Sequence, residues 1–288
     1  MDTVDKVIEN YGINYSRNNI QVVLPQRKDL SDRVEIVNID AKKIFFNEIY
    51  FVDGIQSCIL IKYENYHPIY LIKIVAGAIG KDNLVTNKVE VTKVISAVLN
   101  KESLKELFAE NELHFIDSLD PHDTTIFTEK IIANMRGELE MNVVKNVSTR
   151  EPNSLIVLDG SISNLPAQAN IVVGVVKSTN SKYLKNESEI FSLAEGEISK
   201  IFSIDKHSEG ENKVLYSCYL RLFTNNEMAW NYGLVRLESY FPENLKEVAK
   251  IVFDYRQDNP YKDIRGDRHL APIKNLEDIL KYELPYIL

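Results

Sequence analysis

The sequence predicts an α/β protein in which a mixed β-sheet is flanked by helices, and three features predict it. Two runs rich in β-branched and aromatic residues, 49–63 and 68–80, are separated by the turn sequence ENYH and predict a β-hairpin. Helical spacing of apolar residues predicts a long helix over 122–147. The short apolar runs at 155–158 and 171–176 are typical of strands buried on both faces.

The other elements extend the same domain. We expect helical structure within 84–114, 242–255 and 276–284, and strands over 214–223 and 233–240. Asp123 or Thr124 is expected to cap the long helix. Because no repeat, low-complexity tract or Pro/Gly linker divides the chain, we expect a single domain over 1–288, with a core of roughly 45–285 and an N-terminal extension, 1–44.

Composition limits the possible functions. The chain has 288 residues, of which 44% are hydrophobic and 26% charged, which is ordinary for a soluble protein. A net charge of -8 argues against a protein that simply coats nucleic acid, but an acidic metal site and a basic groove can share one surface. The N-terminus lacks the apolar stretch of a signal peptide and no run of 18 apolar residues occurs, so we expect no membrane span and a cytoplasmic location.

Two aspartates interrupt or end apolar strands. Asp53 lies inside IYFVDGIQSCIL, and Asp159 follows the apolar run of LIVLDGSISNLP. A lone buried carboxylate is costly and needs a partner or a metal ion, and ligands bind at strand ends in α/β sheets. The two Asp-Gly pairs therefore predict a site, although each could also be an ordinary turn.

A third carboxylate is expected from the helix before Asp159. On a helical wheel of roughly 100° per residue, Glu140 falls on the flank of the apolar face, whereas Glu138 falls on the opposite side. The alternative is that Glu140 is a boundary residue paired with Arg136. Three convergent carboxylates suit Mg²⁺ or Mn²⁺, which can activate water for phosphodiester cleavage. No His/Cys cluster suggests zinc, and no P-loop or dinucleotide fingerprint is present.

Several short motifs in order resemble those of the NurA-family nucleases over roughly residues 45–285. They are VDG at 52–54, VLDGSISNLP at 157–166, GVVKS at 174–178, YLRLF at 219–223, LVRLE at 234–238 and DYRQDNPYKDIRGDRHLAPI at 254–273.

The resemblance implies an RNase H-like core, a homodimer, and Mn²⁺- or Mg²⁺-dependent cutting of DNA, with 5′-to-3′ exonuclease and single-strand endonuclease activity. It also implies a HerA-type hexameric ATPase as partner, in the processing of DNA ends for repair or in defence against phage.

The resemblance also implies site residues. Asp53 matches the aspartate of the family's first strand, Asp159 that of the Asp-Gly-Ser motif, and Glu140 best fits the expected helical glutamate. Tyr261 and His269 resemble a Tyr and a His near the family's C-terminus, so His269 is predicted to join the three acids as a metal ligand.

Each of the last two assignments has an alternative. Asp267 or Asp263 could be the last ligand in place of His269, which could be a surface histidine. Tyr261 could stack on a DNA base, or could pack the C-terminal loop.

Three cations are also candidates for the site. Lys177 could bind the scissile phosphate and assist catalysis, or could simply reach solvent at its strand end. Arg221 and Arg236 could contact the DNA backbone or pair with acidic neighbours such as Glu238.

Two functions therefore compete. The first is a metal-dependent DNA nuclease that acts with a motor ATPase. The second is a catalytically inactive RNase H-like scaffold that docks on the ATPase ring, which the acidic net charge favours. A third, weaker interpretation is an unrelated α/β enzyme whose Asp-Gly pairs are plain turns.

Overall fold

The computed structural model describes residues 46–163, 171–177, 183, 188–208, 211–224, 230–257 and 266–284, with backbone alone at 205–208 and 211–213. It also gives the backbone of two short strands near the N-terminus, at 27–29 and 34–35. Tyr261 and Asp263 lie outside the described residues, so their predicted roles stay predictions.

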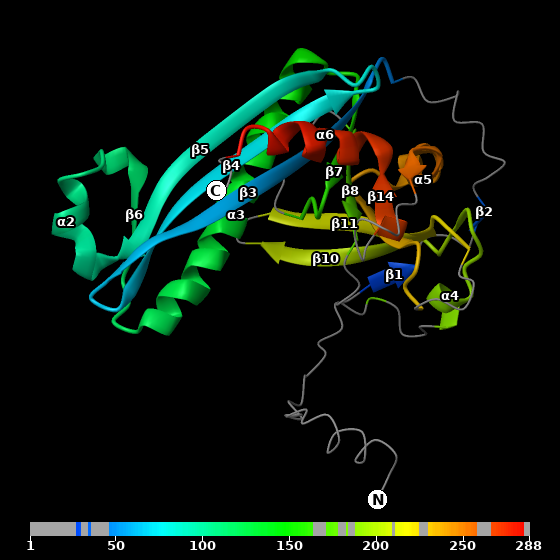
Figure 1. Cartoon of the computed structure of the whole chain (residues 1–288). Helices are drawn as coiled ribbons and strands as arrows, with labels where there is room; N and C mark the ends of the chain where they lie inside the picture. Colours follow the sequence, from blue (N-terminus) through cyan, green and yellow to red (C-terminus); the bar gives the residue numbers. More distant parts are fainter. Residues whose placement is uncertain are drawn as a thin grey trace, which may run out of the picture.

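Most strands belong to one large sheet (Figure 1). The strands are β1 (Arg27–Asp29), β2 (Val34–Glu35), β3 (Ile49–Glu64), β4 (His67–Gly80), β5 (Val85–Ala97), β6 (Leu113–Ile116), β7 (Leu155–Asp159), β8 (Ile171–Val176), β9 (Glu197–Ile198), β10 (Phe202–Ser208), β11 (Glu211–Arg221), β12 (Leu234–Ser239), β13 (Arg256–Gln257) and β14 (His269–Leu270). The helices are α2 (Lys101–Lys105), α3 (Pro121–Arg150), α4 (Ser188–Phe191), α5 (Leu245–Asp254) and α6 (Ala271–Lys281), with 3-10 turns η2 (Val98–Asn100), η3 (Glu110–Glu112), η4 (Pro242–Asn244) and η5 (Gly266–Arg268).

The centre of the sheet has the arrangement predicted for an RNase H-like fold. β3, β4 and β5 form an antiparallel meander, α3 follows, and β7 then pairs parallel with β3. β8 pairs parallel with β7, which gives the order β5-β4-β3-β7-β8. The fold class is defined by this order: three antiparallel strands, a helix, and two parallel strands beside the first strand. The expected mixed sheet is confirmed.

The β3–β4 hairpin is confirmed, whereas the helical expectation for 84–114 is wrong over most of that range. Asn65 and Tyr66 both have positive φ at the hairpin turn, as a tight two-residue loop requires. Residues 85–97 form β5, whose valines alternate with polar residues at a period of two and pair along the length of β4. The helical pieces of this range are the short α2 and the 3-10 turns η2 and η3, because cross-strand pairing outweighs the local helix propensity.

Helix α3 is the long helix that the apolar spacing predicts. Asp120 caps it, in place of the predicted Asp123 or Thr124, because its carboxylate accepts the backbone N–H of His122 at 2.8 Å. The buried positions of its second half include Val143 and Val147, which pack against the sheet. Among the residues that the structure describes, no helix is long and apolar enough to cross a membrane.

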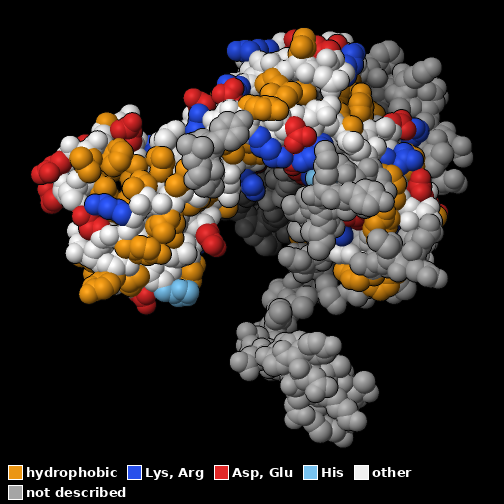
Figure 2. Space-filling view, viewed as in Figure 1, with side chains coloured by type: hydrophobic (Ala, Val, Ile, Leu, Met, Phe, Trp, Pro, Cys, Tyr) orange, Lys and Arg blue, Asp and Glu red, His pale blue; other side chains and the backbone are white. Residues whose placement is uncertain are grey.

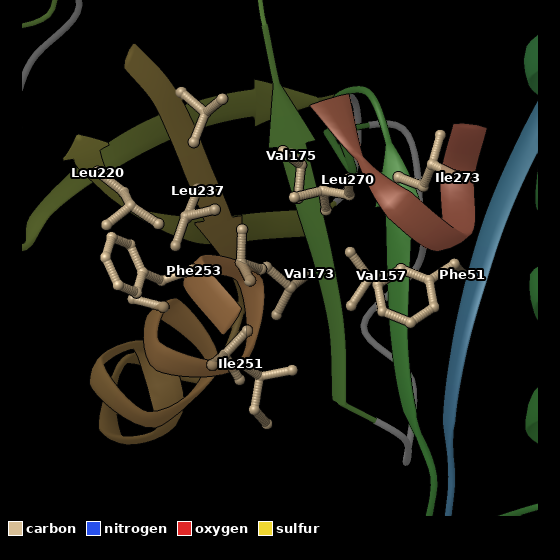
Figure 3. Packing of buried hydrophobic residues seen from close by; sticks show 14 of the residues in the cluster. Phe51, Val157, Val173, Val175, Leu220, Leu237, Ile251, Phe253, Leu270 and Ile273 are labelled. Carbon is tan, nitrogen blue, oxygen red and sulfur yellow. The ribbon is translucent and has the colours of Figure 1, made fainter. Parts of the chain in front are cut away.

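The two faces of the sheet have separate hydrophobic cores. Phe51 and Val157 point to the face that α5 and α6 cover, where they belong to one hydrophobic cluster with Ile251 of α5 and Ile273 of α6 (Figure 3). Their neighbours in the strands point to the other face, toward α3. Successive residues of a strand point to opposite faces of the sheet. The second residue after Phe51 in β3 and after Val157 in β7 therefore points to the same face as these two residues.

The far end of the meander carries α2, β6 and the beginning of α3 and lies apart from the rest of the molecule (Figure 1). Apolar side chains are visible on its surface in Figure 2. The exposed apolar residues of these elements include Leu60, Ile61, Tyr66, Leu107 and Phe127. Among the described helices, α3 and α2 pack against this end.

Candidate metal centre

The two predicted aspartates lie side by side where β3 and β7 stop pairing. The last parallel pair joins Val52 to Leu158, and Asp53 and Asp159 are the next residue in each strand. By alternation with Phe51 and Val157, both belong to the face that α6 covers. Two separate Asp-Gly sequences therefore meet at one point of the sheet.

A third carboxylate arrives from α6. Carboxylate oxygens of Asp53, Asp159 and Glu277 lie within 4.8 Å of one another. Oxygen atoms of carboxylates are the ligands that Mg²⁺ and Mn²⁺ prefer. The donor set and its spacing thus fit one hard divalent cation.

The electrostatics of Asp53 show why a cation suits this place. Its side chain is 7% exposed, and its Oδ1 accepts the N–H of Gly54 at 2.8 Å. Burial raises its pKa well above the ordinary value, and repulsion by Asp159 and Glu140 raises it further, while Lys177 acts in the opposite direction. A divalent cation would relieve this repulsion and hold the carboxylates in their charged form.

Lys177 points into the cluster, as predicted from its strand end. Its Nζ lies 2.6 Å from Oδ2 of Asp159, and the side chain is 9% exposed, so the alternative of a solvent-facing lysine is wrong. Arg268 fixes the backbone here, since its Nη1 donates to the carbonyl of Lys177 at 2.8 Å. The ammonium group is thus placed to offset part of the negative charge.

Glu140 approaches from the α3 face. Gly54 has no side chain, and a Cβ there would stand 2.7 Å from Oε1 of Glu140, so the glutamate packs directly over the strand backbone. Its Oε1 is 3.5 Å from Nε of Arg136, which is the ion pair considered as an alternative. Burial raises the pKa of Glu140 to about 7; Arg136 opposes the shift and Asp159 adds to it.

Glu140 therefore borders the metal centre, but the group of three oxygen ligands does not include it. Sequence reasoning placed it correctly on the flank of α3. It could not show that Asp53 and Asp159 turn toward the opposite helix. Its predicted role as ligand stays a prediction.

The Asp-Gly-Ser turn is held by a buried glutamate of β12. Oε2 of Glu238 accepts the hydroxyl of Ser161 at 2.6 Å and the N–H of Ile162 at 3.1 Å. Its Oε1 pairs with Arg236 at 2.6 Å, which balances the buried charge. Gly174 lets the turn pass close by, because a Cβ there would stand 2.5 Å from the carbonyl oxygen of Gly160.

The two arginines predicted to contact DNA have other partners. Arg221 is fully buried and donates to backbone carbonyls that include those of Ile190 and Leu193, so the prediction that it contacts DNA is wrong. Arg236 is 5% exposed, pairs with Glu238 and lies 4.4 Å from the ring centre of Tyr183. The acidic-neighbour alternative is thus the correct one for Arg236.

The C-terminal candidates are buried within the fold. His269 lies in β14, paired with Gln257, and is 3% exposed, so the alternative of a surface histidine is wrong. Asp267 accepts the N–H of Gly233 and pairs with Arg268 at 3.3 Å, which engages its Oδ2 inside the protein. Among the described residues, the acidic group that could hold a cation includes Glu277 and neither of these two, whose predicted roles as ligands stay predictions.

Glu277 is the site residue that sequence reasoning missed. The predicted helix began at 276, whereas α6 begins at Ala271. On a wheel that includes the first turn, Glu277 falls roughly 40° beyond Ile273, on the flank of the apolar face that Ile273, Leu276 and Leu280 form. That position on an apolar face is the signal that would have identified it, as it did for Glu140.

A mixed sheet with acidic side chains at the end of its central paired strands is the arrangement of an RNase H-like protein with a group of carboxylates that could hold a metal ion. The chain belongs to the NurA family, a family of nucleases, since the family's NurA domain matches residues 47–274.

Two further comparisons add little to this assignment. No curated protein matches the chain. Among solved structures, that of Aquifex aeolicus Argonaute is similar over 83% of this chain at 12% identity, with a TM-score of 0.30. The aligned part is 29% of that longer chain.

Proposed function

We propose that the protein is a metal-dependent DNA nuclease whose cation is held by Asp53, Asp159 and Glu277. The observation that carries the proposal is the convergence of these carboxylates, from β3, β7 and α6, within 4.8 Å of one another. Membership of a nuclease family supports the reaction class.

A bound Mn²⁺ or Mg²⁺ would supply Lewis-acid chemistry, lowering the pKa of a bound water and stabilising charge on the phosphate oxygens. The chain's own residues prepare the place. The three carboxylates fix the position of the cation. Lys177, 2.6 Å from Asp159, is positioned to attract a phosphate group and to reduce the repulsion within the cluster.

Glu140 and His269 have supporting roles in this proposal. Glu140 carries a pKa of about 7, which suits a group that exchanges a proton near neutral pH. His269 begins β14, directly after η5. In this proposal its side chain turns toward the three carboxylates when the cation binds, and acts there as a ligand or a proton donor.

A cleavage assay with single-stranded DNA and Mn²⁺ tests the proposal. Asp53→Asn, Asp159→Asn and Glu277→Gln should abolish cleavage while the far-ultraviolet circular dichroism stays that of the wild type. Asp278→Asn is the matched control, because its side chain is 52% exposed on the same helix as Glu277. Full metal-dependent activity in the two aspartate variants would contradict the proposal.

The biological setting is proposed from the family resemblance. We propose a homodimer that works with a HerA-type hexameric ATPase, as a 5′-to-3′ exonuclease and single-strand endonuclease, in DNA end processing or anti-phage defence. An acidic protein, with a net charge of -8, would depend on such a partner to hold DNA. Comparing cleavage of 5′- and 3′-labelled strands, with and without the ATPase, tests the polarity and the dependence.

The same acidic charge favours the inactive scaffold as the second candidate function. A scaffold would bind the ATPase ring but would cleave no DNA, with either Mn²⁺ or Mg²⁺, alone or in the complex. Metal-dependent cleavage that is lost in Asp159→Asn would exclude it.

A further inference from the structure

A cavity opens beside the metal centre, on the α3 face of the sheet. Its volume is about 350 Å³, within the range of small-molecule sites. Leu158 and Ser161 form one wall, and they stand on either side of the Asp-Gly pair of the proposed site. Glu140, which packs over Gly54 next to Asp53, also lines the cavity.

The other wall is one side of α3, and a glycine keeps it open. Asn134, Gly137 and Met141 lie one turn apart on that helix and line the cavity. A Cβ at Gly137 would meet nothing within 4 Å, so neither a backbone contact nor packing requires glycine there. Glycine in the middle of a helix lowers helix stability, which makes its presence in a 30-residue helix costly.

The lining suits a neutral ring with polar edges. Met141 and Leu158 supply apolar contact, while Asn134 and Ser161 supply hydrogen-bonding groups. Glu138 and Glu140 add negative charge, which disfavours a phosphate in the cavity itself. A phosphate group would instead lie outside the cavity, at the proposed cation and Lys177.

We propose that this cavity binds the base and sugar of one nucleotide of the DNA strand while its phosphate lies at the metal centre. This subsite rests on the proposed function and names where the substrate is held. Apolar contact with Met141 and Leu158 and the shape of the cavity recognise the base, so all four bases would bind with similar affinity.

Calorimetric titration of the full-length protein with Mn²⁺ and thymidine 5′-monophosphate tests the subsite, with inorganic phosphate as the second probe. The wild type should bind the nucleotide more tightly than phosphate. Gly137→Leu should weaken nucleotide binding roughly tenfold, the loss expected when one apolar contact in a pocket is blocked, and leave phosphate and Mn²⁺ binding unchanged. Gly137→Ala is the matched control, since it favours the helix equally but leaves the cavity open.

Equal affinity for the nucleotide and phosphate in the wild type, or equal nucleotide affinity in the leucine and alanine variants, would overturn the subsite. Failure of the proposed function gives a different result: no Mn²⁺ uptake that depends on Asp53. The comparison of the two Gly137 variants decides the subsite in that case too.

Discussion

Replacing Glu140 with glutamine should stabilise the protein in the absence of metal, and by an amount that depends on pH. Burial raises the pKa of Glu140 from 4.5 to about 7. Between these two values the folded protein binds the proton and the unfolded chain releases it, so the free energy of unfolding falls as the pH rises through this window. The difference of about 2.5 pH units is worth about 3 kcal/mol above neutral pH.

Glutamine keeps the size of the side chain and removes the charge. The ion pair with Arg136 is lost, but Arg136 is 42% exposed and that pair contributes little. Glu140→Gln should therefore raise the free energy of unfolding by about 3 kcal/mol at about pH 8.5 and by about 1 kcal/mol at about pH 5.5. Glu138→Gln is the control on the same helix; Glu138 is exposed, and its replacement should change stability by less than about 0.5 kcal/mol.

Urea unfolding in EDTA at the two pH values, followed by circular dichroism, measures these differences. The reasoning predicts that the gap between the variant and the wild type widens by about 2 kcal/mol from the lower to the higher pH. A gap that stays constant with pH, or a variant less stable than the wild type at pH 8.5, would refute it.

The remaining predictions concern packing around the site. Gly54→Ala should destabilise the protein by about 1 kcal/mol, because the added Cβ would stand 3.0 Å from Cγ of Arg136 and 3.1 Å from Cγ of Glu140, so both side chains must shift; thermal unfolding measures it, and an unchanged midpoint contradicts it. Ser161→Ala should weaken Mn²⁺ binding several-fold in calorimetry, because the hydroxyl ties the turn to Glu238, whereas unchanged affinity would mean that the turn holds without it. A thiol reagent should modify Cys58 in the native protein and both thiols only after unfolding.

Sequence reasoning succeeded where a local pattern and its spatial consequence coincide. The long helix, the β-hairpin and the buried parallel strands follow from periodicity, and Asp53 stands out because it interrupts an apolar strand. The same reasoning failed in 84–114. There, pairing with a strand that the pattern does not identify as a neighbour determined the structure of β5.

The composition of the ligand group could not be predicted from local patterns. Which helix supplies the third carboxylate depends on the face to which Asp53 and Asp159 turn, and that depends on the register of β3 against β7. The side chains of Asp53 and Asp159 turn to the face of α6, so the group of nearby carboxylates includes Glu277 and not Glu140. In the same way, a buried arginine such as Arg221 has the same sequence signature whether it binds DNA or backbone carbonyls.

Calorimetric titration of Mn²⁺ into Glu277→Gln and Asp278→Asn tests the central claim most directly, because the two side chains are neighbours on α6 and only the first faces Asp53 and Asp159. We predict that the glutamine variant loses at least tenfold in Mn²⁺ affinity, the effect of removing one charged ligand, and that the asparagine variant binds like the wild type. Equal Mn²⁺ affinity in both variants would contradict a metal centre built from these three carboxylates.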